Sequence, residues 1–439
     1  MNLPQHILFC IDRLESAGFA AYCVGGCVRD HVLGLQPHDY DLCTAATPEQ
    51  LRQLFADHPL VLSGEKHGTV SVVIHHELVE ITTFRTEGGY TDSRHPDWVH
   101  FETDIRADLS RRDFTINAMA WSPTRGFADP FGGREDLARG VLRCVGEPEA
   151  RFTEDALRIL RGVRFSVRFR LTVEQRTRDA MFRLTPLMDA LARERVMDEL
   201  CKLLPKTEAA DLLEFAPVLT QVLPELKPTI GFDQQNPHHL YDVYTHTAHT
   251  VAACPADPVL RLAALLHDVG KPACFTTDEA GIGHFYGHDE LSADMANTIL
   301  HRLKASNEMR HRITEVIRHH MTPLTPNKRS LRRRMAKLGV EGVRDLLVLQ
   351  RADRIGTGTG NPSVFDQVEA LIEELLAENA CLSLKDLAIN GRDLMALGFE
   401  GRAIGQCLSA LLEQVLDERL PNEKEALLCE AKKHPGGSL

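Results

Sequence analysis

The spacing of apolar residues changes once along this chain, and that change restricts the folds open to it. Up to about residue 85, apolar residues alternate in short runs between Gly turns, which indicates strands mixed with short helices. From residue 154 onwards they recur three and four residues apart, as in EDALRILRGVRF, and the helical pattern continues through the second half. The sequence therefore predicts a small domain of strands and helices followed by helical domains.

The length and charge of the chain limit its organisation and its partners. With 439 residues it is too long for one hydrophobic core, so we expect two to four domains, with boundaries near 145, 230 and 375. Lys and Arg number 50 and Asp and Glu 62, which gives a net charge of −12. This argues against nonspecific nucleic-acid binding by the whole surface, although a local basic stripe remains compatible with it.

The cysteines and the N-terminus indicate a compartment. The 11 cysteines form no CxxC pair, which is typical of a reduced intracellular protein rather than a disulfide framework or a zinc site. The first helix carries charges, unlike a signal peptide, and no apolar run is long enough to span a bilayer. We therefore expect a cytoplasmic protein without a membrane partner, and its oligomeric state stays open.

The first third predicts a regular series of short elements. In order, they are a helix at 3–17, a short strand that leads into a turn at 20–26, a helix at 28–34, a strand at 38–45, a helix at 48–55, and a hairpin at 68–85 that turns near His75 and His76. Residues 85–103 are polar and aperiodic and predict a long loop, which in a compact domain is often functional or mobile.

Two aspartates, Asp39 and Asp41, follow a Gly pair and a short helix. In a strand, residues i and i+2 point to the same face, so the two carboxylates would repel each other. A Mg²⁺ ion removes this conflict and keeps positions for substrate phosphates. Gly25 and Gly26 let backbone amides approach a triphosphate, and Arg29 can neutralise it. The alternative is a solvated strand end.

Glu80, in the strand VEITTF, could supply a third carboxylate across the sheet. An exposed strand residue explains it equally well, so its catalytic role depends on where the fold places it.

Several ordered motifs carry a family resemblance. VGGCVRDHVLG followed by DYD resembles the class II tRNA nucleotidyltransferases and bacterial poly(A) polymerases of the polymerase-β superfamily. RRDFTINAMA, DPFGGREDL, EDALRILRGVRF and ARERVMDEL resemble their later motifs and keep the family order over about the first 200 residues. The resemblance implies an α+β polymerase-β-like nucleotidyltransferase head at 1–145, followed by a mostly α-helical neck at 146–230, an HD domain at 231–375 and a tail at 376–439.

The resemblance also implies roles in the head. Mg²⁺ would bind Asp39 and Asp41, Gly26 and Arg29 would hold the triphosphate, and the 3′ end of an RNA would attack the α-phosphate of the incoming nucleotide. Further nucleotide contacts or supporting groups are implied at Arg112, Asp113 and Asn117.

Four arginines repeat at helical spacing in the fourth motif. Arg158, Arg161, Arg164 and Arg168 lie three, three and four residues apart and would share one helix face, with Phe165 among them. A basic surface helix is the alternative, but no acid lies between the first and the last arginine. The pattern therefore favours an anionic partner, with Arg161 and Arg164 contacting phosphate or orienting the helix.

Asp155 and Arg158 lie three residues apart and could act as acceptor and donor against one base edge. By resemblance they would select cytosine and then adenine without a nucleic-acid template. A good bidentate base contact is worth about 1–3 kcal/mol of discrimination. A flexible loop is implied for the change from C to A, and residues 85–99, with Asp92 and Arg94, occupy its place.

A second group of residues suits a metal. The pattern H…HD…D resembles the HD phosphohydrolase superfamily and implies His246, His267, Asp268 and Asp353 as ligands of a divalent transition metal or Mg²⁺. His288, and either His319 or His320, are candidates for further ligands. A single buried histidine is more often only hydrogen-bonded, so the prediction depends on the ordered set. The implied activity is hydrolysis of phosphate esters, including 3′ phosphates.

The C-terminal part predicts helices. Residues 321–339 are basic and could contact RNA phosphates, or form a solvated helix face. Residues 382–428 resemble the helical region that is implied to hold tRNA, and their charge is not basic, unlike the tails expected of poly(A) polymerases.

The first interpretation is a CCA-adding tRNA nucleotidyltransferase with tRNA, CTP and ATP as partners. The close alternatives are an A-adding enzyme and a poly(A) polymerase. An HD phosphohydrolase with a sensory head is disfavoured by the intact DYD and RRDFTINAMA, and a signal-protein uridylyltransferase by RRDFTINAMA and EDALRILR. A non-enzymatic RNA-binding module would not need two metal sites.

Overall fold

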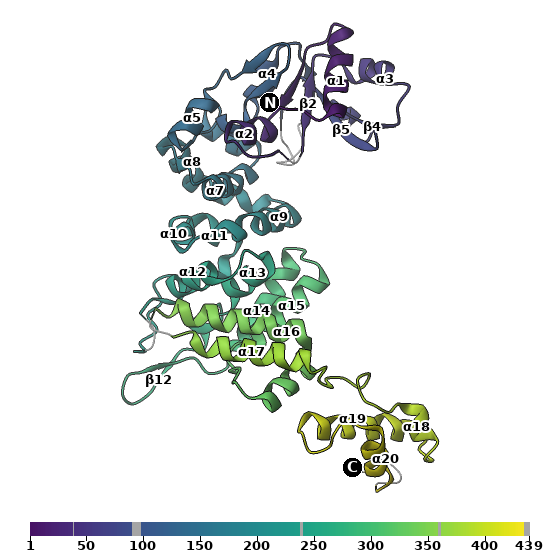
Figure 1. Cartoon of the computed structure of the whole chain (residues 1–439). Coiled ribbons are helices and arrows are strands. Elements are labelled where there is room, and N and C mark those ends of the chain that lie inside the picture. The colour runs from purple at the N-terminus through teal and green to yellow at the C-terminus, as the bar shows by residue number, and fades with distance from the viewer. Residues whose placement is uncertain (38, 90–97, 238–239, 359–360, 434–439) are drawn as a thin grey trace. The chain divides into compact units, whose positions relative to one another are not determined.

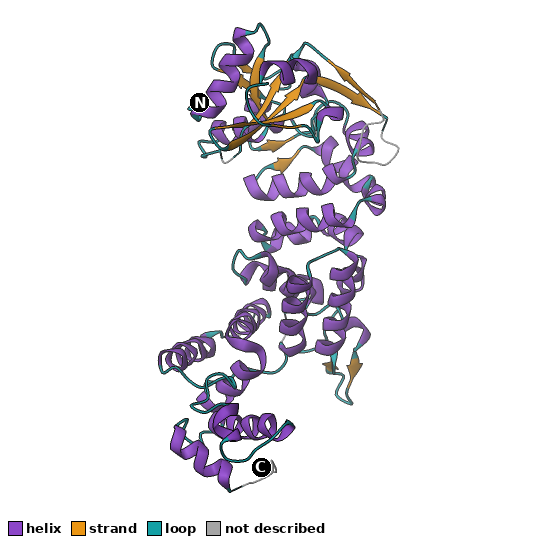
Figure 2. Cartoon of the chain, turned by 90° about the vertical axis from the view of Figure 1, so that its right-hand side faces the viewer, coloured by secondary structure: helices purple, strands orange, loops and turns teal. Residues whose placement is uncertain are grey.

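The computed structural model describes every residue except 38, 90–97, 238–239, 359–360 and 434–439. The described chain forms two compact units, one containing 1–206 and 214–224, the other 207–213 and 225–439. Strands are concentrated in the first unit and helices make up nearly all of the second (Figure 1, Figure 2). This arrangement confirms the predicted fold class, whereas the boundaries of the four domains stay a prediction.

A seven-stranded sheet forms the centre of the first unit, in the order β3-β4-β5-β2-β1-β8-β9. The strands are β1 (Ala21–Val24), β2 (Asp41–Thr44), β3 (Leu60–Val61), β4 (Thr69–Ile74), β5 (Glu77–Thr83), β8 (Ala120–Ser122) and β9 (Gly126–Ala128). β2 runs parallel to β5 and antiparallel to β1, which pairs Asp41 with Val24. The Gly turn after β1 therefore lies beside the carboxylate that begins β2.

The helices before residue 225 surround this sheet or follow it in the chain. They are α1 (Gln5–Ser16), α2 (Gly26–Val32), α3 (Pro48–Leu54), α4 (Ile105–Ser110), α5 (Gly133–Arg139), α6 (Pro148–Glu154), α7 (Leu157–Phe169), α8 (Gln175–Arg183), α9 (Arg193–Leu203), α10 (Ala209–Glu214) and α11 (Ala216–Val222). Local sequence fixes several starts: Thr47 and Gln50 form a capping box at α3, and Pro48 occupies its first turn. α1 packs its buried face, which includes Ile7 and Ile11, against β1 and β5.

In the described part of the second unit, the only strands are those of the short hairpin β12 (Thr276–Thr277) and β13 (Gly283–His284), and the other regular elements are helices. Its helices are α12 (Val243–Ala253), α13 (Pro258–Leu266), α14 (His288–Arg302), α15 (Asn307–His319), α16 (Lys328–Gly356), α17 (Ser363–Ala377), α18 (Gly391–Met395), α19 (Arg402–Leu416) and α20 (Lys424–Lys432). α12 packs along α16, and α14 along α15. The last three helices share their own apolar cluster, built around Leu394, Leu411 and Leu427.

The long loop predicted at 85–103 is partly wrong. β6 (Arg85–Gly88) and β7 (Trp98–Phe101) form an antiparallel hairpin, with Gly88 opposite Trp98. The polar sequence hid this pairing because the ribbon is held by polar side chains, such as Glu87, whose carboxylate accepts a hydrogen bond from Arg85 at 2.9 Å. The predicted switch residues Asp92 and Arg94 lie outside the described residues.

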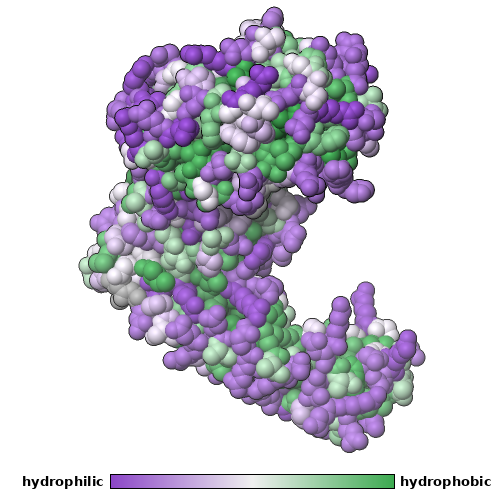
Figure 3. All heavy atoms as spheres, turned by 45° about the horizontal axis from the view of Figure 1, so that its top comes forward, coloured by the Kyte–Doolittle hydropathy of each residue, from purple (hydrophilic) through white to green (hydrophobic). Residues whose placement is uncertain are grey.

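Among the described residues, no helix is both long and apolar enough to cross a membrane. Figure 3 shows hydrophilic side chains over most of the face that it displays, with smaller apolar areas between them.

Candidate active site and a second, histidine-rich site

A polar pocket of about 430 Å³ opens in the first unit beside β1, the start of β2 and α7. Thirteen of the residues that the sequence singled out line it: Gly25, Gly26, Arg29, Asp41, Arg112, Asp113, Asn117, Asp155, Arg158, Arg161, Arg164, Phe165 and Arg168. Among the described residues, Arg111 and Arg195 also line it. We call this the nucleotide pocket, after the ligand that the sequence predicts for it. Asp39 and Glu80 do not line it.

Gly25 has a φ of +71°, which L side chains rarely adopt, and this lets the chain turn sharply from β1 into α2. A Cβ at this position would lie 2.8 Å from Nη1 of Arg112. The glycine therefore provides both the turn and the space in which the Arg112 guanidinium lies.

The two carboxylates missing from the nucleotide pocket line an adjoining acidic hollow of about 610 Å³. Asp39, Asp41 and Glu80 all contribute to it, together with Glu77. The parallel register that pairs Leu42 with Ile81 puts Asp41 beside Glu80. The predicted strand was too long, since β2 begins at Asp41 and Asp39 precedes it, but both aspartates still line one hollow.

Asp41 belongs to both cavities. Burial raises the pKa of its carboxyl, Arg112 lowers it, and the neighbouring Asp39 raises it again, so the pKa lies above its ordinary value. A divalent cation would relieve both the burial of this charge and its repulsion by Asp39. The oxygen donors in the hollow therefore fit a hard cation such as Mg²⁺.

A chain of buried contacts connects α2 to α7 through the RRDFTIN segment. Nη1 of Arg29 donates to Oδ1 of Asn117 at 2.5 Å, and Nδ2 of Asn117 donates to Oδ1 of Asp113 at 3.1 Å. Nε of Arg161 donates to the other oxygen of Asp113 at 2.8 Å. Burial alone would raise the pKa of Asp113, but Arg161 and Asn117 bring it to about 2. Hydrogen bonds therefore connect these residues into one network that stabilises the pocket wall.

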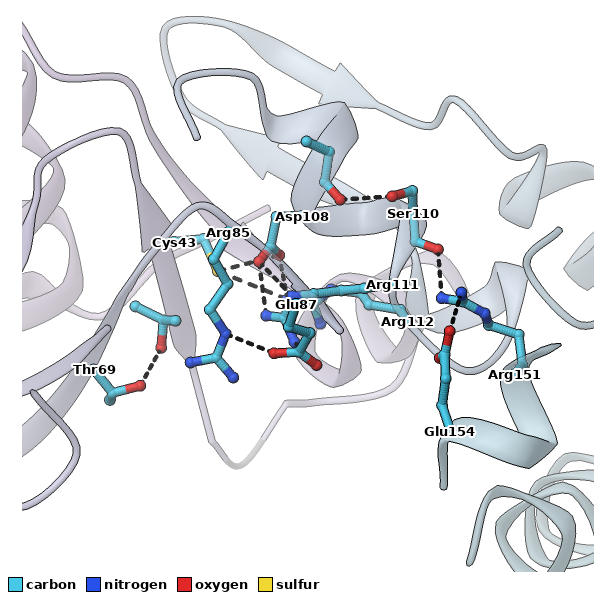
Figure 4. Close-up of polar contacts among 12 residues, drawn as sticks. Cys43, Thr69, Arg85, Glu87, Asp108, Ser110, Arg111, Arg112, Arg151 and Glu154 are labelled. Atoms are coloured by element: carbon cyan, nitrogen blue, oxygen red, sulfur yellow. Dashed lines mark hydrogen bonds and ion pairs between the residues drawn. The ribbon is translucent and has the colours of Figure 1, made fainter. Parts of the chain in front are cut away.

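Asp108, which the sequence did not single out, is fully buried beneath the pocket wall. It accepts hydrogen bonds from Arg111 at 2.7 Å and from Arg112 at 3.1 Å, as Figure 4 shows. Arg111 also donates to Glu87 on β6 at 3.2 Å, and Arg85 donates to Glu87 at 2.9 Å. The polar core of this region therefore ties the β6–β7 hairpin to two arginines of the nucleotide pocket.

The two predicted base-reading residues line the same pocket but bind other groups of the protein. Arg158 donates to Glu154 at 2.7 Å and to the carbonyl of Arg111 at 2.9 Å. Asp155 accepts from Arg195 at 2.7 Å. Both side chains are thus oriented before any nucleotide enters. Arg195 lies in the ARERVMDEL motif, but its own role was not visible in the sequence.

The four arginines of α7 do share one face, since all of them line the nucleotide pocket. The sequence has no acid between Arg158 and Arg168, and from this we inferred an anionic partner, but acids of the protein do contact these arginines. Acids come from other segments: Glu154 pairs with Arg158, Asp113 with Arg161, and Glu199 with Arg164 at 2.5 Å. Sequence spacing cannot reveal Asp113 and Glu199, because they are distant in the chain. Glu154 lies only four residues before Arg158, at the end of the preceding helix.

In the second unit, the predicted His and Asp ligands come together from three helical segments. His246 is on α12, His267 and Asp268 follow α13, and Asp353 is on α16. Nε2 of His246 lies 2.9 Å from Asp353 and 3.3 Å from Asp268, and Nε2 of His267 lies 3.2 Å from Asp268. His288 and His320 meet Asp268 through its other oxygen, at 3.3 and 3.8 Å. Asp268 therefore joins two groups of candidate ligands.

Backbone carbonyls orient three of these histidines. The Nδ1 atoms of His267, His288 and His320 lie 2.7, 2.6 and 2.6 Å from the carbonyl oxygens of Ala264, Phe285 and Ile317. A carbonyl only accepts, so each Nδ1 donates, and a neutral ring then has its lone pair on Nε2. Since these Nε2 atoms face Asp268, the arrangement fits a metal cation.

Charge at this centre also favours a cation. Burial lowers the pKa of His267, but Asp268 raises it more strongly, to about 10, so the carboxylates favour a positive charge there. Burial and the neighbouring His267 lower the pKa of His320 to about 4, which leaves its ring neutral at pH 7. Of the two alternatives His319 and His320, only His320 belongs to the cluster, because His319 lies 3.9 Å from Glu315 instead.

The basic segment 321–339 binds acids of the chain's own tail. Arg329 and Arg333 both contact Asp417, at 3.0 and 2.7 Å, and Arg332 pairs with Glu418. Neither interpretation from sequence, RNA contact or solvated face, included this internal pairing.

Family models match three parts of the chain. The poly A polymerase head domain matches residues 21–143, the RNA and SrmB-binding site of polymerase A matches 170–230, and tRNA nucleotidyltransferase domain 2 matches 275–431. All three models therefore describe parts of poly(A) polymerases or tRNA nucleotidyltransferases.

Relatives extend over nearly the whole chain. The CCA-adding enzyme of Lactiplantibacillus plantarum is 33% identical over 429 residues, covering 95% of this chain and 93% of the relative. That of Latilactobacillus sakei subsp. sakei is 32% identical and covers 96% of both. Among solved structures, the Bacillus stearothermophilus CCA-adding enzyme in complex with CTP is 28% identical, with a TM-score of 0.71 over 99% of this chain and 98% of that one.

Proposed function

The chain belongs to the family of CCA-adding enzymes, and we propose which of its own residues carry out that reaction. It is a nucleotidyltransferase that adds C and A to the 3′ end of tRNA, with CTP and ATP as substrates. Nucleotidyltransferases of this kind use a divalent metal, typically Mg²⁺.

The observation that carries the assignment of residues is the position of Asp41. It lines the acidic hollow and the nucleotide pocket at once. A cation held there by Asp39 and Asp41 would lie where the triphosphate in the pocket meets the RNA 3′ end in the hollow. Glu80 is the third carboxylate of the hollow and is proposed as a supporting catalytic group. When bound, the metal stabilises the attacking and leaving oxygens of the transfer.

The triphosphate is assigned to the turn after β1. Gly25 and Gly26 offer close approach to the backbone, and Arg112 presents its guanidinium into the space that Gly25 leaves open. Arg29 adds positive charge, although its bonds to Asp30 and Asn117 give it a supporting role as well. Asp113 and Asn117 fix this wall, and Arg161 and Arg164 complete its positive lining.

Base selection is assigned to Asp155 and Arg158. Cytosine and adenine both present an exocyclic amine beside a ring nitrogen that accepts a hydrogen bond. A carboxylate that accepts and a guanidinium that donates match this edge, and no nucleic-acid template is needed.

The test is nucleotide addition to transcripts of one tRNA ending before CCA, after C and after CC, with CTP and ATP supplied singly and together. We expect C, C and A, after which addition stops. Addition of A alone to the CC-ended transcript would indicate an A-adding enzyme, and long A tracts on any RNA a poly(A) polymerase.

Asp39→Asn and Asp41→Asn should reduce addition to background while tRNA still binds. Glu77→Gln is the matched control, because Glu77 lines the same hollow without an assigned role and should keep activity. Full activity in both aspartate variants would refute the assigned metal site.

A second activity is favoured by the histidine-rich cluster. We propose that His246, His267, Asp268 and Asp353 hold a divalent metal, with His288 and His320 as further ligands, in an HD phosphohydrolase domain. A pocket of about 480 Å³ adjoins the cluster and includes Lys271 and Arg354, which suits a phosphate ester. A bound metal would polarise the phosphoryl group and activate water.

Metal analysis of the purified protein tests this second site directly. His267→Ala should lose the bound metal and the release of phosphate from RNA ending in a 3′ phosphate, whereas His319→Ala should keep both. Equal metal content in wild type and His267→Ala would refute the site.

The remaining domain roles are also proposals. The head at 1–145, the neck at 146–230 and the HD domain at 231–375 follow from the motifs, and the tail at 376–439 is proposed to bind tRNA. The separate apolar cluster of α18–α20 supports a distinct tail. The Thermotoga maritima CCA-adding enzyme complexed with tRNA shares the fold at 21% identity and a TM-score of 0.57.

A further inference from the structure

Arg195, the third residue of α9, forms a two-point contact with one of the proposed base-reading residues. Its Nη2 lies 2.7 Å from Oδ2 of Asp155, and its Nη1 lies 3.3 Å from Oδ1. A planar guanidinium that meets a carboxylate at both oxygens fixes the plane of that carboxylate as well as its position. Both side chains line the nucleotide pocket. The exposed fraction of the side chain is 24% for Arg195 and 16% for Asp155.

The contacts of Asp155 limit what else it can bind. Besides Arg195, the backbone N–H of Leu157 donates to Oδ1 at 3.0 Å. A carboxylate has about four acceptor positions and no donor while it is ionised. Three positions are therefore used by the protein, and one remains for a donor in the pocket.

The same helix also holds the other arginines of the site. Glu199 lies one turn after Arg195 and is buried, and it pairs with Arg164 at 2.5 Å and approaches Arg161 at 4.0 Å. Residues four apart share a helix face. α9 therefore presents a cation to Asp155 and an anion to α7 from one face, which fixes the base-reading segment at two points.

The chemistry of the four bases gives this arrangement a consequence. Cytosine and adenine present an amine donor at the position that would meet Asp155. Uracil and guanine present a carbonyl oxygen there, which an acceptor repels. Discrimination therefore requires that the carboxylate stays in place as an acceptor and does not rotate away from the base.

We propose that Arg195 is a positioning residue for nucleotide selection, which holds the Asp155 carboxylate in the orientation that accepts the amine of cytosine or adenine. The proposal rests on the proposed function of the nucleotide pocket. Arg195 acts through the carboxylate that it contacts, so its loss should affect the choice between nucleotides as well as the rate.

The experiment compares wild type with Arg195→Gln and Arg195→Lys in the full chain. Addition of C and of U to a tRNA transcript ending before CCA is measured for each, with kcat and KM determined separately. In Arg195→Gln, we expect the ratio of kcat/KM for CTP to that for UTP to fall by about tenfold or more, the size of one bidentate base contact. Arg195→Lys should give an intermediate ratio, because an ammonium group keeps the charge but not the planar fork.

Arg193→Gln is the matched control. Arg193 lies on the same helix, and its guanidinium donates to the carbonyl of Asp189 rather than to a residue of the pocket. It should keep the wild-type ratio, and melting temperatures of all four proteins should be compared.

The possible outcomes distinguish a failure of the proposed function from a failure of the role proposed for Arg195. If wild type adds neither C nor A, the proposed function fails. If wild type adds both and Arg195→Gln keeps the wild-type ratio of CTP to UTP, this inference is overturned while the proposed function stands. A uniform loss with both nucleotides and a lower melting temperature means a structural role only and also overturns it.

Discussion

Individual residues of the nucleotide pocket are constrained by space and backbone conformation as well as by charge. Gly25 is the clearest case, since its positive φ and its closeness to Arg112 both exclude a side chain. Phe169 is another, because its ring lies 4.5 Å from the Arg29 guanidinium and holds it within the pocket wall. The proposed roles therefore depend on neighbours that carry no charge.

Gly25→Ala should lose nucleotide addition because the new Cβ would displace Arg112 and strain the turn. Strain of this kind costs about 1–3 kcal/mol. Steady-state kinetics with CTP and thermal unfolding would measure both effects.

Gly34→Ala is the control, because Gly34 has the same φ of +71°, but among the described residues no atom beyond its chain neighbours lies within 4 Å of its Cβ position. It should lose stability and keep its kcat/KM. Wild-type kinetics in Gly25→Ala would contradict the steric argument.

The hairpin β6–β7 depends on a charge network rather than on an apolar core. Glu87 has a nearly buried side chain, 7% exposed, and receives both Arg85 and Arg111. Glu87→Gln removes the negative charge that accepts the hydrogen bonds of the two arginines. A hydrogen bond to a charged group contributes about 1.5–3 kcal/mol to stability. We expect hydrogen exchange of residues 85–88 and 98–101 to accelerate by about tenfold or more.

Glu102→Gln serves as the comparison, since Glu102 also follows the hairpin and accepts from Thr86 but does not contact Arg111. Its exchange rates should stay near those of wild type. Unchanged exchange in Glu87→Gln would show that the strand pairing alone holds the hairpin.

Elements with strong local patterns could be predicted from the sequence, and those held by distant partners could not. The apolar and Arg spacing of α7 and the alternation of β4 and β5 are local, so both were predicted. The β6–β7 hairpin was missed because its stabilising residues, such as Asp108 and Arg111, come from another segment. In the histidine cluster, order along the chain identified the set, but only the fold could choose His320 over His319.

In the second unit, ion pairs connect α16 to the C-terminal helices. Asp417 receives Arg329, Arg333 and Arg419, and its side chain is only 2% exposed. Asp417→Asn should release α19 from α16, so that a protease of broad specificity cleaves the segment around residues 378–390 faster than in wild type. High salt should have a similar effect on wild type if these pairs provide the attachment.

Glu413→Gln removes a carboxylate of the same region that is 62% exposed and lies 3.7 Å from Arg333. Exposed pairs of this kind contribute little, so its cleavage rate should match wild type. Equal rates for all three proteins would mean that apolar contacts attach the tail.

The division of the chain into units has a consequence for how such a protein can be recombined. The first unit takes up 1–206, leaves out the next seven residues and resumes with 214–224. A crossover between two related genes at codon 206 would therefore supply helix α11 from the wrong parent, whereas one after codon 224 would misassign only 207–213. We therefore expect a crossover after codon 224 to yield a folded hybrid protein more often than one at codon 206, only eighteen codons earlier.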